Sequence, residues 1–447
     1  MEQLTISPFT RPASGTVSLP GSKSITNRAL ILAALSRESL TLEGALFSED
    51  TEIMISALKA LGFTLSPDPA GNSIFIVGRG GYILGRDIEI NVGNAGTAAR
   101  FLTAMLALKP RASFRLDGSE AMRKRPMKGL LDVLTHNGAI VPEFSGEPGF
   151  FPFEIKTRGL FGGTLSVDAS ASSQILSALL MVAPLAGGPT TVELTGETVS
   201  RPFIDMTLTM MAQFGTEPKS VEHGRYHFAG EHSYYCARPA YVIEPDATAA
   251  SYFMALPWVT GGSLRLQRMG NICLQGDIGF TEVMAALGMD SQTEDEDLVV
   301  SPKSAPAGDI PASFDFNAIS DTFLTLAAIS PLLEKPITIT GIAHTRKQET
   351  DRVHAMATEL RKLGQRVAET EDSLTITPDL AALKAATATA PVAIDTYHDH
   401  RVAMSFGILG CRNLHGDGRP WITINDPGCC AKTFPRFFEV LNDLRPS

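Results

Sequence analysis

The chain has 447 residues, of which 44% are hydrophobic, and this is more than a single ordinary core accommodates. We therefore expect two or three globular domains. A formal net charge of −10, with only two Trp and seven Tyr, argues against a protein that wraps nucleic acid, which needs a basic face and aromatic platforms. Any anion that the chain binds must be held by a local basic cluster.

No segment predicts a targeting signal or a membrane span. The amino terminus lacks a basic stretch followed by an apolar run, and the longest apolar helix, "QILSALLMVAPLAGG", stops early at Pro184. The five cysteines lack metal-ligand spacing, which favours reduced thiols in a cytoplasm. They are Cys236, Cys273, Cys411, Cys429 and Cys430. The vicinal pair is expected to act as small buried hydrophobic residues rather than as a redox pair.

An internal repeat of about 75 residues runs through the chain. Six segments each pass from an extended run through a polar junction into an Ala-rich or Leu-rich helix, as in "GSKSITNRALILAAL". The junctions recur every 72 to 80 residues, at Ser24, Gly96, Ser172, Thr248, Asp321 and Arg401. A second, amphipathic helix recurs with the same period, and short alternating runs between the helices predict strands. Each repeat should therefore contain two helices and several strands.

Glycines mark the ends of the second helices. Gly62, Gly138, Gly215, Gly288 and Gly364 follow the last apolar turn, where a left-handed residue commonly ends a helix. Such repeats could simply stack as a solenoid. The polar residues of the six junctions differ, however, whereas the helices stay alike. We therefore expect the junctions to be parts of one site.

Three of the junctions could hold anions. A helix start preceded by Gly or Ser offers free backbone N–H groups and the positive end of the helix dipole. The residues concerned are Lys23, Ser24 and Arg28 in the first junction, Gly96 in the second, and Ser172, Ser173 and Gln174 in the third. For any one junction alone, a capped helix with solvated charges is an equally good interpretation. The three together favour anion binding.

Further cations and candidate acids lie in the second-helix segments and late junctions. The cations are Arg125, Arg352, Arg401 and Lys432, and together they predict a substrate with several anionic groups. The candidate acids and bases are Asp321, Glu349 and the neighbours Asp399 and His400. "HDH" at 398–400 lacks a further ligand at metal spacing, so no metal site is predicted. "GRGGYILG" at 78–85 has no helix after it, which favours a hairpin turn over a dinucleotide loop.

These motifs in this order resemble the 5-enolpyruvylshikimate-3-phosphate synthase family of enolpyruvyl transferases. The resemblance runs from "PGSKSITNRA" through "GNAGTAAR", "KRPM", "SSQ", "EPDATAASYF", "QGD", "ETDR" and "DHR" to "AKTFP". It implies an α/β (α+β) fold of two domains, each with three βαβαββ repeats, buried helices and outer sheets. Domain I would comprise residues 1–21 and 242–447, and domain II residues 22–241. The chain would cross near Pro20 to Ser22 and Tyr241 to Glu244, with the active site in the interdomain cleft.

The resemblance also implies a reaction and the residues that perform it. The family transfers the enolpyruvyl group of phosphoenolpyruvate to the 5-hydroxyl of shikimate 3-phosphate by addition and elimination. It needs no metal or organic cofactor, and its members are usually cytoplasmic monomers. Catalysis would involve Lys23, Asp321 as acceptor of the hydroxyl proton, and Glu349 for proton exchange at the methylene carbon. Phosphoenolpyruvate would be bound by Lys23, Gly96, Arg125, Gln174, Arg352, Arg401 and Lys432. Shikimate 3-phosphate would be bound by Lys23, Ser24, Arg28, Ser172, Ser173, Gln174, Ser200, Asp321 and Gln348.

The sequence departs from the family pattern at three places. Phe203 stands where Tyr is frequent, Gln348 where Lys often precedes Glu349, and Phe101 where Pro often follows "TAAR". These changes bear on phosphate affinity and on sensitivity to the phosphoenolpyruvate analogue glyphosate rather than on the reaction.

The sequence is also compatible with two other classes of protein. The sister family that transfers enolpyruvyl to UDP-N-acetylglucosamine shares the six-repeat fold. It usually carries a reactive Cys before the "RP" segment, and "KPRASFRLDGSEAMRKRP" has none. A non-catalytic repeat scaffold is the other alternative, and it would not require Asp321, Glu349 and the cations together.

Overall fold

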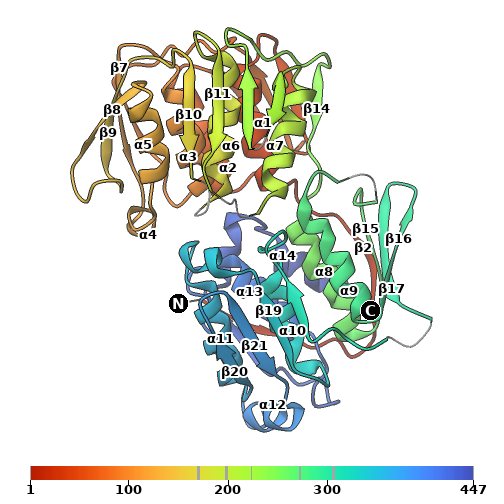
Figure 1. Ribbon diagram of the computed structural model, residues 1–447. Helices are drawn as coiled ribbons and strands as arrows, with labels where there is room; N and C mark the ends of the chain where they lie inside the picture. The colour runs from red at the N-terminus through yellow and green to blue at the C-terminus, as the bar shows by residue number, and fades with distance from the viewer. Residues whose placement is uncertain are drawn as a thin grey trace. The chain divides into compact units, whose positions relative to one another are not determined.

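The computed structural model describes residues 2–168, 172–196, 200–222, 224–270, 273–304 and 308–445. The chain forms two compact units. Unit 1 consists of Met1–Pro20 and Pro245–Ser447, and unit 2 of Gly21–Glu244. Within the described residues, each unit contains three small sheets together with the helices of three repeats (Figure 1).

The second repeat shows the βαβαββ pattern most simply. Its elements are β6 (Ile88–Asn91), α3 (Gly96–Leu106), β7 (Ala112–Asp117), α5 (Lys128–His136), β8 (Ile140–Phe144) and β9 (Phe153–Thr157), with the short α4 (Glu120–Arg123) before α5. The sheet order is β6-β7-β9-β8. β6 and β7 run parallel, and α3 forms the crossover connection that parallel strands need; the other neighbours run antiparallel.

The other two repeats of unit 2 have the same order. One contains β10 (Gly163–Val167), α6 (Ser173–Val182), β11 (Thr190–Leu194), α7 (Pro202–Gln213), β12 (Ser220–Glu222) and β13 (Arg225–Phe228). The other contains β14 (Ala240–Val242), α1 (Lys23–Leu35), β3 (Leu40–Glu43), α2 (Glu49–Ala60), β4 (Thr64–Asp68) and β5 (Ser73–Val77). Its first strand, β14, comes from the end of the unit and pairs in parallel with β3.

Unit 1 takes strands from both ends of the chain. Its first repeat is β2 (Ala13–Val17), α8 (Ala247–Thr260), β15 (Gly262–Leu266), α9 (Phe280–Ala286), β16 (Met289–Glu294) and β17 (Asp297–Pro302). Its second is β18 (Ser313–Asp315), α10 (Phe323–Ile329), β19 (Ile337–Thr340), α11 (Arg352–Lys362), β20 (Arg366–Glu369) and β21 (Ser373–Thr377). Its third is β22 (Val392–Ile394), α13 (His400–Gly410), β23 (Ile422–Asn425), α14 (Phe437–Asp443) and β1 (Gln3–Ile6). The predicted α/β fold of repeated units is confirmed.

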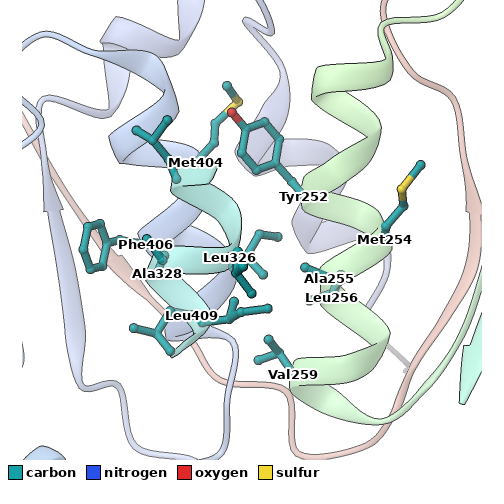
Figure 2. Packing of buried hydrophobic residues seen from close by; sticks show 14 of the residues in the cluster. Tyr252, Met254, Ala255, Leu256, Val259, Leu326, Ala328, Met404, Phe406 and Leu409 are labelled. Carbon is teal, nitrogen blue, oxygen red and sulfur yellow. The ribbon is translucent and has the colours of Figure 1, made fainter. Parts of the chain in front are cut away.

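The first helix of each repeat lies in the core of its unit. In unit 1, Leu256 of α8, Leu326 of α10 and Leu409 of α13 are fully buried and lie close together (Figure 2). Helices that are apolar on nearly every side belong in an interior, and each such leucine contributes roughly 2 kcal/mol through burial. Because the rest of each helix is apolar, most of the polar candidate site residues lie near the amino-terminal ends of these helices.

Three smaller predictions have clear outcomes. Gly62, Gly138, Gly215, Gly288 and Gly364 all have positive φ, between 75° and 90°, so the predicted helix ends are confirmed. The expected hairpin at 78–85 is wrong, because β5 and β6 on either side belong to different sheets. A link between two repeats uses the same turn residues as a hairpin, including Gly80 and Gly81 with positive φ. All five cysteines are free thiols.

None of the described helices combines the length and apolar character needed to cross a bilayer.

Candidate active site

Arg28 is a buried cation in unit 2 whose described partners are all neutral. From α1, its Nε donates to Thr207 Oγ1 at 2.8 Å and its Nη2 to Ser177 Oγ at 3.2 Å. Its Nη1 donates to the Ser24 carbonyl oxygen at 3.1 Å. Burial lowers the pKa of the Arg28 guanidinium to about 9. A buried cation without a carboxylate is costly, and a bound anion would offset that cost.

Two aromatic rings flank the same guanidinium. Arg28 Cζ lies 5.2 Å from the ring centroid of Phe101 and 5.7 Å from that of Phe203, within cation–π range. Phe101 is buried inside α3, so the helix accommodates this departure from proline. The two rings limit the movement of the Arg28 guanidinium, but they supply no negative charge, and it has no counter-ion among the described residues.

Gly96 and Arg125 form a second close contact in unit 2. A Cβ added at Gly96, the first residue of α3, would lie 2.6 Å from Arg125 Nη2 and 2.7 Å from Nη1. Only glycine therefore lets the guanidinium approach this helix start. Arg125 Nε and Nη1 are buried and have no hydrogen-bond partner among the described residues. Buried donors normally have acceptors, so this arginine is suited to an anionic ligand.

The remaining predicted residues of unit 2 also lie at helix starts. Ser172 caps α6 by accepting from Gln174 N at 3.3 Å, and Ser173 is the first residue of that helix. Gln174 Oε1 is buried and has no hydrogen-bond partner in the described part of the chain. Ser200, with φ of 52°, is a buried residue shortly before α7.

Lys23 is the first residue of α1, and its ammonium group has an acidic neighbour. Its Nζ lies 3.3 Å from Asp50 Oδ2, in the first turn of α2. This partner of Lys23 was not predicted from the sequence. Because the pair is largely buried, we expect Asp50 to hold Lys23 in place at the start of its helix.

The acidic candidates of unit 1 gather around Arg352, the first residue of α11. Arg352 Nε donates to Asp399 Oδ2 at 2.7 Å, Nη1 to Asp321 Oδ1 at 2.9 Å and Nη2 to Glu349 Oε2 at 2.9 Å. Gln348 Oε1 also accepts from Nη1. Burial alone would lower the pKa of Arg352, but the surrounding carboxylates outweigh it and raise that pKa above the ordinary value.

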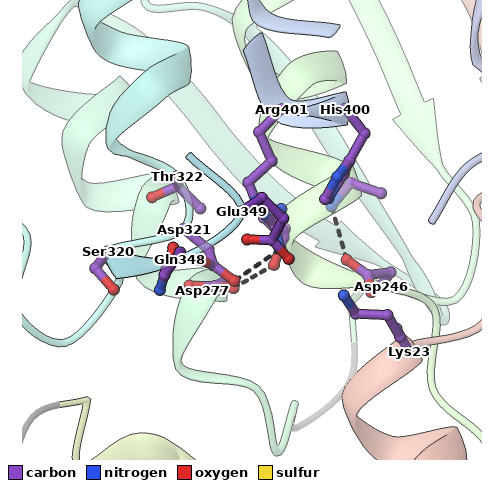
Figure 3. Close-up of polar contacts among 12 residues, drawn as sticks. Lys23, Asp246, Asp277, Ser320, Asp321, Thr322, Gln348, Glu349, His400 and Arg401 are labelled. Carbon is purple, nitrogen blue, oxygen red and sulfur yellow. Dashed lines mark hydrogen bonds and ion pairs between the residues drawn. The ribbon is translucent and has the colours of Figure 1, made fainter. Parts of the chain in front are cut away.

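Two further cations complete this network. Arg401 Nη2 lies 2.7 Å from Asp321 Oδ2, and Lys432 Nζ lies 2.9 Å from Glu349 Oε1. Figure 3 shows Asp321, Glu349 and Arg401 close together, with Gln348 beside them. The side chains of Asp321 and Glu349 remain 18% and 11% exposed. Each of these two carboxylates therefore bridges two cations and keeps an accessible edge for proton transfer.

Asp399 is placed differently from the other acidic candidates. It is fully buried, pairs with Arg352 and caps α13 by accepting from Arg401 N at 2.9 Å. These contacts favour a supporting role for Asp399 over direct acid–base chemistry. His400 next to it is fully buried as well.

The described residues contain no group of three or more His, Cys, Asp or Glu side chains that could hold a metal ion.

The structure brings the predicted residues together in two sets. All six from unit 1 join one network: Asp321, Gln348, Glu349, Arg352, Arg401 and Lys432. Those of unit 2 lie at the start or within the first two turns of α1, α3 and α6, with two exceptions. Arg125 lies between α4 and α5 and reaches the start of α3 with its guanidinium, and Ser200 lies before α7. Thr207 and Ser177, which orient Arg28, were missed. Both are polar residues on otherwise apolar helices, and this signal could have identified them.

Comparison with known proteins gives one consistent answer. Residues 9–441 match the family described as EPSP synthase (3-phosphoshikimate 1-carboxyvinyltransferase). The chain is 50% identical over 447 residues to a 3-phosphoshikimate 1-carboxyvinyltransferase of Opitutus terrae, covering 99% of this chain and 97% of the relative. A protein of the same name from Trichormus variabilis is 41% identical over 446 residues, covering 99% of this chain and all of the relative.

A solved structure supports the fold. The structure of an EPSP synthase from Acinetobacter baumannii aligns with a TM-score of 0.79 at 24% identity, covering 100% of this chain and 98% of that chain.

Proposed function

The chain belongs to the EPSP synthase family, and from this premise we propose that its two polar clusters together form the active site. The enzyme transfers the enolpyruvyl group of phosphoenolpyruvate to the 5-hydroxyl of shikimate 3-phosphate and releases phosphate, a step of the shikimate pathway. One observation supports assigning most of the anion binding to unit 2 and the proton transfer to unit 1. In unit 2, the buried Arg28 and the half-buried Arg125 have no carboxylate partner among the described residues, whereas unit 1 holds two carboxylates that each bridge two cations.

Unit 2 supplies most of the anion-binding groups in this proposal. Shikimate 3-phosphate is bound at Arg28, with the helix starts around Ser24, Ser172, Ser173 and Gln174, and with Ser200. Phosphoenolpyruvate is bound beside Gly96 by Arg125, with Lys23 between the two substrates. The free N–H groups of a helix start suit phosphate, and a planar guanidinium suits both phosphate and carboxylate.

Unit 1 supplies the proton chemistry. Glu349 gives a proton to the methylene carbon of phosphoenolpyruvate, and the adjacent carbon becomes electrophilic. The 5-hydroxyl oxygen bonds to that carbon while Asp321 takes its proton. Phosphate then leaves and takes up the proton held by Asp321. Glu349 removes a proton from the new methyl group, which restores the double bond, and both residues return to their starting state. Arg352, Arg401 and Lys432 bind phosphoenolpyruvate and stabilise the charge that develops.

Substrate binding would bring the two units together. We assign residues 1–21 and 242–447 to domain I and residues 22–241 to domain II, as the family resemblance implies. A site made from both domains would exclude water when they close, which protects the intermediate. The enzyme is proposed to work as a cytoplasmic monomer without a cofactor.

Release of inorganic phosphate tests the function directly. The purified chain should release phosphate from phosphoenolpyruvate when shikimate 3-phosphate is present. It should release none with either substrate alone, since the transfer needs both. UDP-N-acetylglucosamine is the matched alternative acceptor. Release that requires the UDP-sugar, or no release with either acceptor, would overturn the assignment.

Gly96→Ala should weaken phosphoenolpyruvate and glyphosate with little effect on folding. The added methyl group would collide with the Arg125 guanidinium, the far end of a flexible side chain that can shift. We expect the KM for phosphoenolpyruvate and the glyphosate concentration for half inhibition to rise roughly 5- to 30-fold, equivalent to about 1–2 kcal/mol. Gly146→Ala is the control, because a Cβ there has nothing within 4 Å. Equal inhibition of both variants would show that Gly96 does not line the site.

A further inference from the structure

Asp277 is a buried carboxylate near the proposed site to which the mechanism gives no role. It lies in a short 3-10 helix, Gly276–Gly279, that is docked on the start of α8. Gln275 fixes this docking, because its Oε1 accepts from Ala247 N at 3.0 Å and its Nε2 donates to Pro245 O at 2.7 Å. The Thr248 hydroxyl, also in the first turn of α8, donates to Asp277 Oδ2. These contacts, all with the start of α8, hold the carboxylate at a defined position.

The surroundings of Asp277 differ from those of Asp321. Figure 3 shows the two side chains next to each other. Asp321 pairs with Arg352 and Arg401, whereas the described structure gives Asp277 no ion pair with a lysine or arginine. Burial raises the pKa of Asp277 to about 7, and the charges of Asp321 and Asp246 act in the same direction. The Thr248 hydrogen bond and the charge of Arg401 oppose this rise.

We propose that Asp277 is a positioning residue that acts through Asp321, because its carboxylate, once charged, makes Asp321 a stronger proton acceptor. A neighbouring negative charge stabilises the protonated form of Asp321. The transfer of the 5-hydroxyl proton to Asp321 then becomes more favourable as Asp277 loses its own proton to solvent. The inference rests on the proposed role of Asp321 in the reaction.

The pH profile of kcat tests the inference. At pH 6 Asp277 is mostly neutral, like the amide of Asp277→Asn, so the two enzymes should have similar kcat. At pH 8 Asp277 is mostly charged, and wild type should be faster by roughly three- to tenfold, because the added negative charge favours proton transfer to Asp321. Any change in substrate protonation affects both enzymes equally, so it cancels in the ratio of wild-type kcat to Asp277→Asn kcat. Asp277→Glu should restore the dependence on pH.

Thr248→Val gives a test that leaves the carboxylate in place. The Thr248 hydrogen bond lowers the pKa of Asp277, so its loss should move the rise in kcat to higher pH. If wild-type kcat exceeds Asp277→Asn kcat by the same factor from pH 6 to pH 8, Asp277 has a merely structural role. If the two kcat values are equal throughout, Asp277 has no role. Either result overturns the inference. If Asp277→Asn does not fold, an unshifted profile in Thr248→Val overturns it instead.

The stability of the two proteins supplies a second readout. The folded pKa of Asp277, about 7, lies above its ordinary value of 3.8, so its contribution to stability is full below about pH 4 and is lost as pH rises through 7. The urea midpoint of Asp277→Asn should therefore increase relative to wild type over this range. A constant difference would contradict the titration on which the inference depends. Wild type that releases no phosphate refutes the proposed function, whereas an active wild type with coincident profiles refutes only this inference.

Discussion

Asp321→Asn should lower kcat by roughly 10²- to 10⁴-fold, the usual contribution of a positioned general base, while the protein stays folded. The amide has the shape of the carboxylate but cannot take the proton of the attacking hydroxyl. Arg352 keeps Asp399 and Glu349 as partners in the variant, so the network loses one acceptor rather than its centre. The KM for phosphoenolpyruvate should change much less than kcat, because Asp321 acts on the hydroxyl.

Steady-state phosphate release, with both substrates saturating, measures this loss. Asp309→Asn is the matched control in the same unit. Asp309 pairs with Lys335 at 2.8 Å, as Asp321 pairs with its arginines, but its side chain is 94% exposed. The control should keep wild-type kcat. An Asp321→Asn enzyme that retains more than about a tenth of wild-type kcat would exclude this residue as the base.

The sequence predicted the fold because the helices, the helix ends and the repeats each have a recognisable sequence pattern. The glycine after a second helix, as at Gly62 or Gly364, is a local requirement for positive φ and needs no knowledge of the rest of the chain. The link at 78–85 could not be told from a hairpin, since turn residues do not indicate which sheet the next strand joins.

The site was predicted less completely, for a related reason. The residue types at the helix starts indicated anion binding and proton transfer, but the pairing of those residues depends on packing between helices. Arg352 meets Asp399 only because α11 and α13 pack in the same unit, and these residues are 47 positions apart. The sequence did not indicate a role for Asp277 beyond its place in the short motif "QGD", because its burial depends on the folded unit.

Arg352→Met should destabilise unit 1 by about 3–5 kcal/mol, the usual cost of removing one partner of a buried ion pair. The Arg352 side chain is 2% exposed, and its loss would leave the fully buried Asp399 carboxylate without its strongest partner. Methionine has a similar length and is apolar, so lost packing contributes little. Arg436→Met is the control, because Arg436 pairs with Glu439 at the surface with 71% of its side chain exposed. It should cost less than about 1 kcal/mol.

Tryptophan fluorescence during urea unfolding can measure the stability of unit 1 in these variants. The two tryptophans of the chain, Trp258 and Trp421, both belong to unit 1. Adding Asp399→Asn to Arg352→Met should recover part of the loss, since an amide tolerates burial better than an unpaired carboxylate and still caps α13. Equal midpoints for Arg352→Met and Arg436→Met would mean that the Arg352 network does not stabilise the unit. Recovery in the double variant would instead locate the cost in the isolated Asp399 charge, and the stability of unit 1 would then depend on the same arginine that is proposed to bind phosphoenolpyruvate.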